Sequence, residues 1–322
     1  MPKRVLVTGG GGFVGANLAR RLQAEGHDVR LLLKPGHKPW RLEGFDPATF
    51  HAVDLADADG VTAAVRAIKP EWVFHLAAYG AYSSQQSWAD MVASNIAGTV
   101  NLVDASVDVG VESFVNTGSS SEYGFKDHAP SETEVLAPNS NYAVTKAAAT
   151  MYCAFSARAH NVRIRTLRLY SVYGPWEEPA RLIPTLLVAG LQGRLPPLAD
   201  RRTARDFIFV DDVCDAYLAV AADTTAPPDA VFNVGTGVQS TLEHVVATVR
   251  RLLDVGEAPR WGTMPDRSWD TTTWVADNRK LVSQLGWRPR HSLEEGLGSM
   301  IEWLRSNTAV RELYESRREA PR

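Results

Sequence analysis

A tyrosine and a lysine four residues apart are the first residues in this sequence whose types and spacing could do chemistry. Tyr142 and Lys146 lie in YAVTK, at the start of a segment with a helical pattern, and this spacing places both side chains on one helical face. An ammonium group near a phenol lowers the pKa of the phenol toward working pH. Tyr142 could then exchange a proton with an alcohol/ketone pair while a hydride moves.

A run of serines provides further hydroxyl groups. Ser119, Ser120 and Ser121 lie in GSSSEYG, directly after the expected strand SFVNTG. At the carboxyl end of that strand, Ser119 could hydrogen-bond the same substrate oxygen and hold it in line, and Ser120 and Ser121 are candidate substrate-binding residues beside it. A Tyr–Lys spacing of four is common by chance on helix surfaces, but its place after these serines and a glycine turn favours a catalytic pair.

The glycine turn lies in VLVTGGGGFVGANLARRL, where Gly9, Gly12 and Gly15 stand between an expected strand and an amphipathic helix. The missing side chains let the backbone turn tightly and approach a pyrophosphate. The helix start, with Phe13 and Val14, presents free N–H groups and a positive dipole end. A glycine connector without a ligand is the alternative, but the strand–turn–helix context is specific. We therefore predict a dinucleotide site.

Four further positions belong to this predicted site. Asp54 and Leu55 follow another expected strand in FHAVDLAD, where the Asp54 carboxylate could accept a hydrogen bond from an adenine amine or simply cap a helix over 57–68. Ala77 and Ala78 in HLAAYGA are small enough for a cofactor to lie against the backbone.

The end of the second expected strand is unusual for a site selective for NAD, which normally offers an acidic residue to the ribose 2′-hydroxyl. The segment DVRLLLKPGHKPWRL instead carries cations at Lys34, His37, Lys38 and Arg41. Cations suit a 2′-phosphate, so the sequence favours NADP(H), with NAD(H) possible and a solvated basic loop as the alternative. Tyr142 and Lys146 would complete the cofactor contacts, Lys146 by bridging the nicotinamide ribose.

Short aliphatic runs alternate with helical patterns from residue 3 to about 170. Strands that alternate with crossover helices build a parallel, doubly wound sheet, so the fold class is α/β and residues 1–175 form a Rossmann-like domain. Beyond Gly174-Pro175 the pattern loosens into proline-rich joints and short strands. Residues 176–322 therefore predict a smaller α/β substrate lobe over the carboxyl ends of the strands, with segments returning to the first domain and a fraying last dozen residues.

Composition excludes several classes of protein. With 322 residues and a formal net charge of −3, the chain lacks the concentrated basic surface that nucleic acid requires. Two cysteines are too few for a disulfide framework or a metal cluster, so no metal is expected. No apolar run is long enough to span a bilayer and no signal-peptide core follows the first residues. A cytoplasmic protein without membrane contact is the expectation.

Six motifs of this sequence resemble, in order, those of the extended short-chain dehydrogenase/reductase family that modifies nucleoside-diphosphate sugars. They are TGGGGFVG, HLAA, GSSSEYG, YAVTK, VYGP and RDFIFVDD. The resemblance covers almost the whole chain. It implies that Ser119, Tyr142 and Lys146 form the catalytic triad and that Asn95 supports the active site through its helix. It also implies hydride exchange at a sugar carbon, usually C4, with the nucleotide held by the C-terminal lobe.

The same resemblance indicates the substrate-binding residues of the second lobe. Arg205 and Arg267 look like the arginines that clamp the diphosphate of the sugar nucleotide, and Arg181 is read either as a ligand contact or as a surface ion pair. Ser171 stands where the family commonly has an Asn that touches the sugar or its phosphate. Asp211 and Asp212 begin a helix and are interpreted as caps rather than ligands.

Three reactions share this family scaffold. The 4,6-dehydratases resemble T-D-E where this chain has Ser119–Ser121, so dehydration lacks its acid and base. The epimerases carry a similar run of small residues but usually hold NAD through an acidic residue on the second strand. GSSSEYG, with Glu122, is similar to GSSEEYG of GDP-4-keto-6-deoxymannose reductases, with a salt bridge as the alternative role of Glu122. Lys34 also favours a consumable NADPH. We therefore expect a reductase of 4-keto sugar nucleotides, with a 4-epimerase as the alternative.

Two further expectations concern assembly and catalysis. Family members commonly dimerise through two helices, here the one through Asn95–Asp108 and the one holding Tyr142–Ala159, and a homodimer is expected, with a monomer as the alternative. From a different functional class, the chain could be a dinucleotide sensor without catalytic activity. This alternative is disfavoured because a sensor has no need to retain Ser119, Tyr142 and Lys146.

Overall fold

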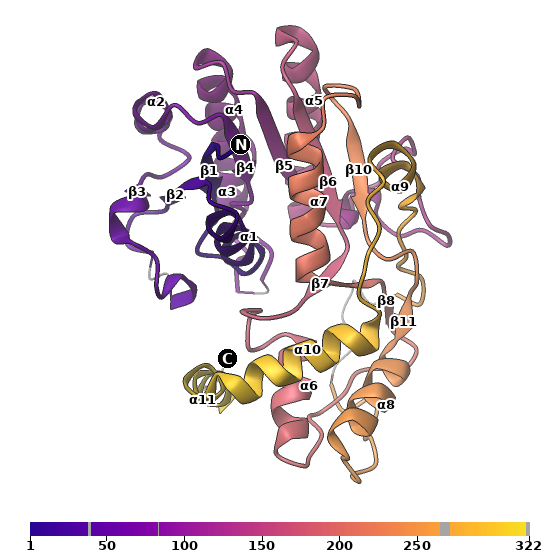
Figure 1. The fold of residues 1–322 in the computed structure, drawn as a ribbon. Helices are drawn as coiled ribbons and strands as arrows, with labels where there is room; N and C mark the ends of the chain where they lie inside the picture. The colour runs from indigo at the N-terminus through magenta and orange to yellow at the C-terminus, as the bar shows by residue number, and fades with distance from the viewer. Residues whose placement is uncertain (38–39, 83, 265–270, 320–322) are drawn as a thin grey trace.

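The computed structural model describes residues 1–37, 40–82, 84–264 and 271–319. Its centre is a seven-stranded, wholly parallel sheet with the order β10-β6-β5-β4-β1-β2-β3. The strands are β1 (Arg4–Thr8), β2 (Asp28–Leu33), β3 (Phe50–Ala52), β4 (Trp72–His75), β5 (Ser113–Ser119), β6 (Ile164–Leu169) and β10 (Val231–Val234). The predicted Rossmann-like α/β fold is confirmed (Figure 1).

Helices cover both faces of the sheet because each central strand is apolar on both sides. Val5 and Val7 of β1 face the core beneath α1 (Phe13–Ala24) and α7 (Val210–Ala222). Leu6, between them, faces the opposite core, which contains side chains of α2, α4 and α5. The helices of that second face are α2 (Ala58–Ile68), α4 (Gly98–Asp108) and α5 (Asn141–His160). Because successive side chains of a strand point to opposite faces of the sheet, β1 packs against the helices of both layers.

The helix predicted through Asn95 contains an irregular segment. It begins as α3 (Trp88–Met91), continues as a π-helical turn η3 (Val92–Ala97) and becomes α4. Asn95 lies inside the π-helical turn and is buried. Such turns are rare and occur often at functional sites, so the irregularity marks the region around Asn95.

The C-terminal lobe has its own apolar core beyond the carboxyl ends of the strands (Figure 1). Its helices are α6 (Leu182–Leu191), α8 (Leu242–Leu253), α10 (Leu293–Ser306) and α11 (Thr308–Glu319), and its short strand pairs are β7 (Ser171–Tyr173) with β9 (Phe207–Phe209) and β8 (Ala204–Arg205) with β11 (Ser240–Thr241). The chain returns to the sheet twice after residue 175, through α7 and through β10, which is followed by α9 (Arg279–Leu285). We propose that the two domains divide at residue 175 and that α7, β10 and α9 return from the second segment to the first domain.

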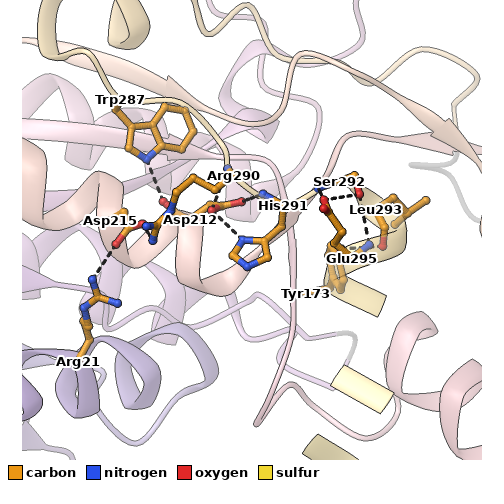
Figure 2. Close-up of polar contacts among 10 residues, drawn as sticks. All are labelled: Arg21, Tyr173, Asp212, Asp215, Trp287, Arg290, His291, Ser292, Leu293 and Glu295. Atoms are coloured by element: carbon orange, nitrogen blue, oxygen red, sulfur yellow. Dashed lines mark hydrogen bonds and ion pairs between the residues drawn. The ribbon is translucent and has the colours of Figure 1, made fainter. Parts of the chain in front are cut away.

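Asp212 ties the two parts of the fold together, which corrects its interpretation as a helix cap. The N-cap of α7 is Phe209 and no side chain caps the helix. The fully buried Asp212 carboxylate instead accepts hydrogen bonds from the amides of Arg290 and His291 at 3.1 Å and from His291 Nδ1 at 3.0 Å (Figure 2). It thereby holds the segment that leads into α10 against α7, a partner that lies too far along the chain to be read locally.

Residues 311–319 also differ from the expectation of a fraying end, because they belong to α11. Tyr314 is fully buried, and its hydroxyl donates to the Glu177 carbonyl oxygen at 2.6 Å. Its ring lies 6.1 Å from that of Trp303 and 6.2 Å from that of Trp40. Aromatic burial therefore fixes a helix whose charged composition suggested solvent.

Three general expectations can be compared with the described residues. No helix among them is long and apolar enough to cross a membrane. Within the same residues, no group of His, Cys, Asp and Glu side chains is arranged to hold a metal ion. Cys153 and Cys214 are free and buried.

Candidate functional site

The glycine turn has the shape that a pyrophosphate requires. Gly9 has a φ of 69°, and a Cβ there would lie 2.5 Å from the backbone N of Ala77. A Cβ on Gly15 would lie 2.2 Å from the Gly9 carbonyl oxygen. Gly12 is the N-cap of α1, which no side chain caps, so the helix start keeps its N–H groups for a ligand. The turn therefore fits a dinucleotide, with Phe13 and Val14 in the first turn of the helix.

Lys34 and Asp54 contact each other at the adenosine end of this candidate site. The Lys34 ammonium lies 3.3 Å from the Asp54 carboxylate, and both side chains are substantially exposed. A backbone hydrogen bond from Ala56, together with Lys34, holds the pKa of Asp54 below its usual value. The charge expected to attract a 2′-phosphate is thus already paired. Leu55 is buried beside Asp54 and Ala78 is exposed beside the half-buried Ala77.

Asn95 joins the cofactor half of the site to the catalytic half. Its side chain accepts a hydrogen bond from the Tyr79 amide and donates one to the Tyr79 carbonyl, both at 2.8 Å. It also donates to the Thr145 hydroxyl at 2.9 Å, and that hydroxyl donates to the Tyr142 carbonyl at 2.9 Å. The loop after β4 is therefore fixed relative to the first turn of α5.

Ser119, Tyr142 and Lys146 come together at the carboxyl end of β5. Ser119 ends the strand, Tyr142 is half-buried in the first turn of α5, and Lys146 is 2% exposed one turn later. A hydrogen bond from the Ser119 side chain acts on the Tyr142 phenol and lowers its pKa. Within the part of the chain that the structure describes, the Lys146 ammonium has no ion pair or hydrogen bond. The ammonium is therefore available to a ribose hydroxyl.

The expected lowering of the Tyr142 pKa by Lys146 is wrong. Burial and the negative charge of Glu122 raise the pKa of Tyr142 to about 12, and the lowering effects of Arg181 and Ser119 are smaller. Burial also lowers the pKa of Lys146. Desolvation disfavours both charged forms, so Tyr142 carries its proton before a ligand enters.

Glu122 lies beneath this triad and does not face a substrate. Its carboxylate is fully buried, accepts from Arg168 Nε at 2.8 Å and from the Thr150 hydroxyl at 3.1 Å, and accepts from the Ser119 amide at 2.8 Å. Together with Ser119 it closes a capping box on the short helix Ser120–Tyr123. Glu122 therefore shapes the strand end, and its likeness to the reductase motif has a structural cause.

Removing the Glu122 charge should destabilise the fold strongly. Glu122→Gln would leave the Arg168 guanidinium, 4% exposed, without its carboxylate, a loss of about 3 kcal/mol in the free energy of unfolding. Urea denaturation would measure the loss. Glu294→Gln breaks an exposed pair with Arg251, which solvent screens, so it should change the stability little. Equal costs for the two variants would contradict the prediction.

The remaining candidate substrate residues come from several segments of the chain. Ser120, 6% exposed, accepts a hydrogen bond from Trp274 Nε1 at 3.2 Å, and the Arg205 guanidinium lies 5.6 Å from the Trp274 ring. The Ser121 amide donates to the Ser119 hydroxyl at 3.2 Å. Ser171 begins β7, and its amide donates to the Asp206 carbonyl at 3.0 Å. Arg267 lies outside the described residues.

Arg181 is the N-cap residue of α6. Its guanidinium is 5.8 Å from the ring of Tyr82, in the loop after β4. The positive charge of Arg181 lowers the pKa of Tyr142, Tyr82 and Glu177. Among the described residues Arg181 has no ion pair, which favours the reading as a ligand contact.

Sequence reasoning missed two residues that the fold brings here, Tyr82 and Trp274. Tyr82 follows a strand end in a fold whose ligands bind at such ends, which was an available signal. Trp274 offered none, because its contact with Ser120 spans 154 positions of the chain.

The comparison with known families decides the assignment. Residues 5–235 match the model of the NAD dependent epimerase/dehydratase family. The chain belongs to this family. Its members include a UDP-glucose 4-epimerase of Mycolicibacterium smegmatis, 33% identical over 318 residues that cover 95% of this chain and 99% of the relative. A dTDP-glucose 4,6-dehydratase of Streptomyces antibioticus is 30% identical, and the match covers 98% of this chain and 97% of the relative.

A solved member of the family shows the same architecture. MoeE5 was determined in complex with UDP-glucose and NAD, and also with UDP-glucuronic acid and NAD. It is 32% identical, with a TM-score of 0.81 over 94% of this chain and 99% of that chain. This family membership confirms the resemblance inferred from the motifs. The two relatives are a 4-epimerase and a 4,6-dehydratase, so the comparisons do not support the expected reduction of a 4-keto sugar. The MoeE5 structures contain NAD, and the expected preference for NADP(H) has no support from them.

Proposed function

We propose that this enzyme of the epimerase/dehydratase family is an NAD-dependent 4-epimerase of a UDP-hexose. The observation that carries the proposal is that the two residues whose presence favoured reduction, Glu122 and Lys34, both form ion pairs within the protein. Glu122 is buried against Arg168 at 2.8 Å, and Lys34 is paired with Asp54 at 3.3 Å. The alternative weighed from the sequence, a 4-epimerase, then agrees with the strand-end serines and with the M. smegmatis relative.

Dehydration is disfavoured by the chemistry of the strand end. Elimination of water needs an acid and a base beside the reacting carbons, and Ser119–Ser121 provide hydroxyl groups only. The carboxylate that follows these serines, Glu122, is fully buried and accepts from three donors. Similarity to the dehydratase of S. antibioticus is therefore similarity of scaffold.

The cofactor is proposed to lie along the glycine turn and to end at Lys146. Gly9, Gly12 and Gly15 would receive the pyrophosphate, with Asp54 near the adenine. The Lys146 ammonium would bond the ribose of the nicotinamide. Bound NAD would accept a hydride from C4 of the sugar and return it. NAD is preferred to NADP because Lys34 is paired with Asp54.

The residues of the chain would handle the proton of the same step. Tyr142 would first release its phenol proton to solvent when the positively charged nicotinamide binds beside Lys146, because both cations favour the phenolate. The phenolate would then accept the C4 hydroxyl proton as the C–H bond gives up its hydride, and Ser119 would hydrogen-bond the oxygen as it becomes a carbonyl. The keto sugar then presents its other face. Tyr142 returns the proton to the oxygen as hydride returns to carbon, so atoms and electrons balance without net consumption of cofactor. Arg181 and Arg205 are proposed contacts for the sugar nucleotide.

Incubation of the enzyme with UDP-glucose tests this proposal. We expect formation of UDP-galactose, followed by proton NMR of the anomeric region, without a net change in absorbance at the wavelength of reduced nicotinamide. Stoichiometric consumption of NADPH with a 4-keto sugar nucleotide would restore the reductase, and loss of water from UDP-glucose would identify a dehydratase.

A homodimer through α4 and α5 remains a proposal. Val144, Met151 and Phe155 of α5 are 44%, 61% and 58% exposed, and their spacing places them on one face of the helix. Met151→Glu should convert a dimer into monomers of 35.2 kDa, because a carboxylate would be buried in an apolar contact. Light scattering after size exclusion measures the mass, and a monomeric unmodified protein at micromolar concentration would refute the interface.

A further inference from the structure

A buried histidine lies between the glycine turn and the helix that carries Asn95. His75 ends β4 and is 1% exposed. In the register of the parallel sheet it lies directly opposite Thr8, the last residue of β1. The Thr8 hydroxyl lies 2.7 Å from Nδ1 of the imidazole, and the Thr99 hydroxyl of α4 lies 2.9 Å from Nε2. The two ring nitrogens therefore join two segments that are far apart in the sequence.

The hydrogen bonds of Thr99 determine which ring nitrogen carries the proton. The Thr99 hydroxyl lies 2.7 Å from the Asn95 carbonyl oxygen, which can only accept, so the single hydroxyl hydrogen points there. Towards His75 the same hydroxyl can then only accept, and Nε2 donates to it. Burial, together with the charge of Lys146, lowers the pKa of His75 to about 3. The ring is therefore neutral, and its Nδ1 accepts from the hydroxyl of Thr8.

On the cofactor side, these contacts end in the backbone that shapes the glycine turn. The Thr8 hydroxyl accepts a hydrogen bond from the Ala77 amide at 3.3 Å. A Cβ on Gly9 would lie 2.5 Å from the Ala77 nitrogen, so the loop after β4 packs against the turn that is proposed to receive the pyrophosphate. The hydrogen bonds that run from the Ala77 amide through Thr8, His75 and Thr99 to the Asn95 carbonyl form the histidine network.

On the catalytic side, the histidine network ends at the π-helical turn η3. Asn95 belongs to this turn, and its side chain pairs with the backbone of Tyr79 in both directions at 2.8 Å. The same side chain donates to the Thr145 hydroxyl, which in turn donates to the carbonyl of Tyr142. His75 is thus linked by continuous hydrogen bonds to the glycine turn and to the first turn of α5.

We propose that His75 is a positioning residue for epimerisation, whose ring sets the distance between the glycine turn and the π-helical turn and thereby aligns Tyr142 with the nicotinamide. The inference rests on the proposed function and names the residue that couples its cofactor half to its catalytic half. At 1% exposed the ring is closed to ligands, so it acts through Thr8 and Thr99. A neutral imidazole suits this role because it accepts at one nitrogen and donates at the other, across a rigid ring.

Two replacements of His75 separate the two sides of the ring. In His75→Asn the amide oxygen takes the place of Nδ1 and can still accept from Thr8, but no donor reaches Thr99. In His75→Gln the longer side chain places its amide NH₂ near Thr99. We expect kcat for UDP-glucose to fall about thirtyfold in His75→Asn, because a small misplacement of the reacting groups slows the reaction. In His75→Gln kcat should stay within about threefold of the unmodified enzyme, and KM and bound NAD within about twofold in both variants.

A merely structural role of His75 would give a different result. It would lower the melting temperature of both variants and leave kcat per bound NAD unchanged. Unchanged kcat in His75→Asn would therefore overturn the positioning role. An equal loss of kcat in His75→Asn and His75→Gln would overturn it too, because the donor to Thr99 would then not matter.

Thr99 provides a second test that leaves the ring in place. Thr99→Val keeps the shape of the side chain and removes the hydroxyl between His75 and Asn95, so kcat should fall as in His75→Asn. The double variant should be no slower than either single variant because both cut the same connection, and multiplied losses would overturn the histidine network. Ser106→Ala is the control: the Ser106 hydroxyl lies in the same helix and donates to the Leu102 carbonyl at 2.6 Å, so kcat should be normal.

A third readout needs neither substrate nor cofactor. The ¹⁵N NMR spectrum of protein labelled in its histidines distinguishes the two neutral tautomers, and the His75 signals are those missing from His75→Gln. We expect a proton on Nε2 and none on Nδ1 at neutral pH. A proton on Nδ1 would reverse the direction of the hydrogen bonds and overturn the histidine network.

The outcomes separate this inference from the proposed reaction. Epimerisation with unchanged kcat in His75→Asn overturns the role of His75 alone. If the unmodified enzyme leaves UDP-glucose unchanged, the proposed reaction is overturned, and hydrogen exchange decides the role of His75. The Tyr79 amide donates to the Asn95 side chain, so it should exchange faster in His75→Asn than in His75→Gln. Equal exchange in the two variants would overturn the positioning role as well.

Discussion

Tyr142→Phe is expected to reduce epimerisation by about 10²–10⁴-fold, the usual contribution of a positioned general acid–base group. The phenol is the proposed proton carrier, and burial raises its pKa to about 12, so the proton is held until a ligand arrives. The ring itself remains in place in the variant. Turnover is measured by NMR with UDP-glucose, and bound NAD by absorbance after heat release.

The control for this variant is a tyrosine on the outer part of the same helix. The Tyr152 hydroxyl contacts the exposed side chain of Asp104, away from the triad, so Tyr152→Phe should keep normal turnover. NAD content should be near normal in both variants because the glycine turn is unchanged. Undiminished turnover in Tyr142→Phe would remove Tyr142 from the mechanism.

Gly15→Ala is expected to weaken dinucleotide binding about a hundredfold. The added Cβ would lie 2.2 Å from the Gly9 carbonyl oxygen and 2.8 Å from its carbon, and both are backbone atoms that cannot rotate away. The start of α1 must move from the turn at a cost of about 3 kcal/mol. Fluorescence titration of the apoprotein with NAD measures the loss.

A second glycine separates this local clash from a general effect of alanine. Gly298 lies in α10, and a Cβ there meets nothing within 4 Å. Gly298→Ala should bind NAD normally and melt at a slightly higher temperature because alanine favours a helix. Equal NAD affinity in Gly15→Ala and in the unmodified protein would refute the proposed pyrophosphate site.

Electrostatic partners could not be predicted from the sequence, although the charged residues themselves were visible. Lys34 was read as a phosphate ligand, but the parallel neighbours β2 and β3 bring Asp54 to 3.3 Å from it. Glu122 was read as a motif residue with a salt bridge as the alternative; the structure confirms the salt bridge, but its partner, Arg168, lies 46 positions along the chain and could not be named. In each case the partner comes from a neighbouring strand, so the charge balance depended on strand order.

Local chemistry explains what the sequence by itself determined. The parallel sheet follows from strands and helices that alternate along the chain, and the glycine turn follows from steric needs of adjacent residues, with Gly9 at a φ of 69°. The spacing of Tyr142 and Lys146 follows from helical periodicity.

Tertiary structure alone decided the protonation of the site and the packing of the last helix. Burial by several elements raises the pKa of Tyr142 and lowers that of His75, and burial is a property of the assembled chain. The same applies to α11, whose Tyr314 is covered by aromatic rings from other segments. Periodicity and sterics act between neighbours in sequence, whereas desolvation and ion pairing act between neighbours in space.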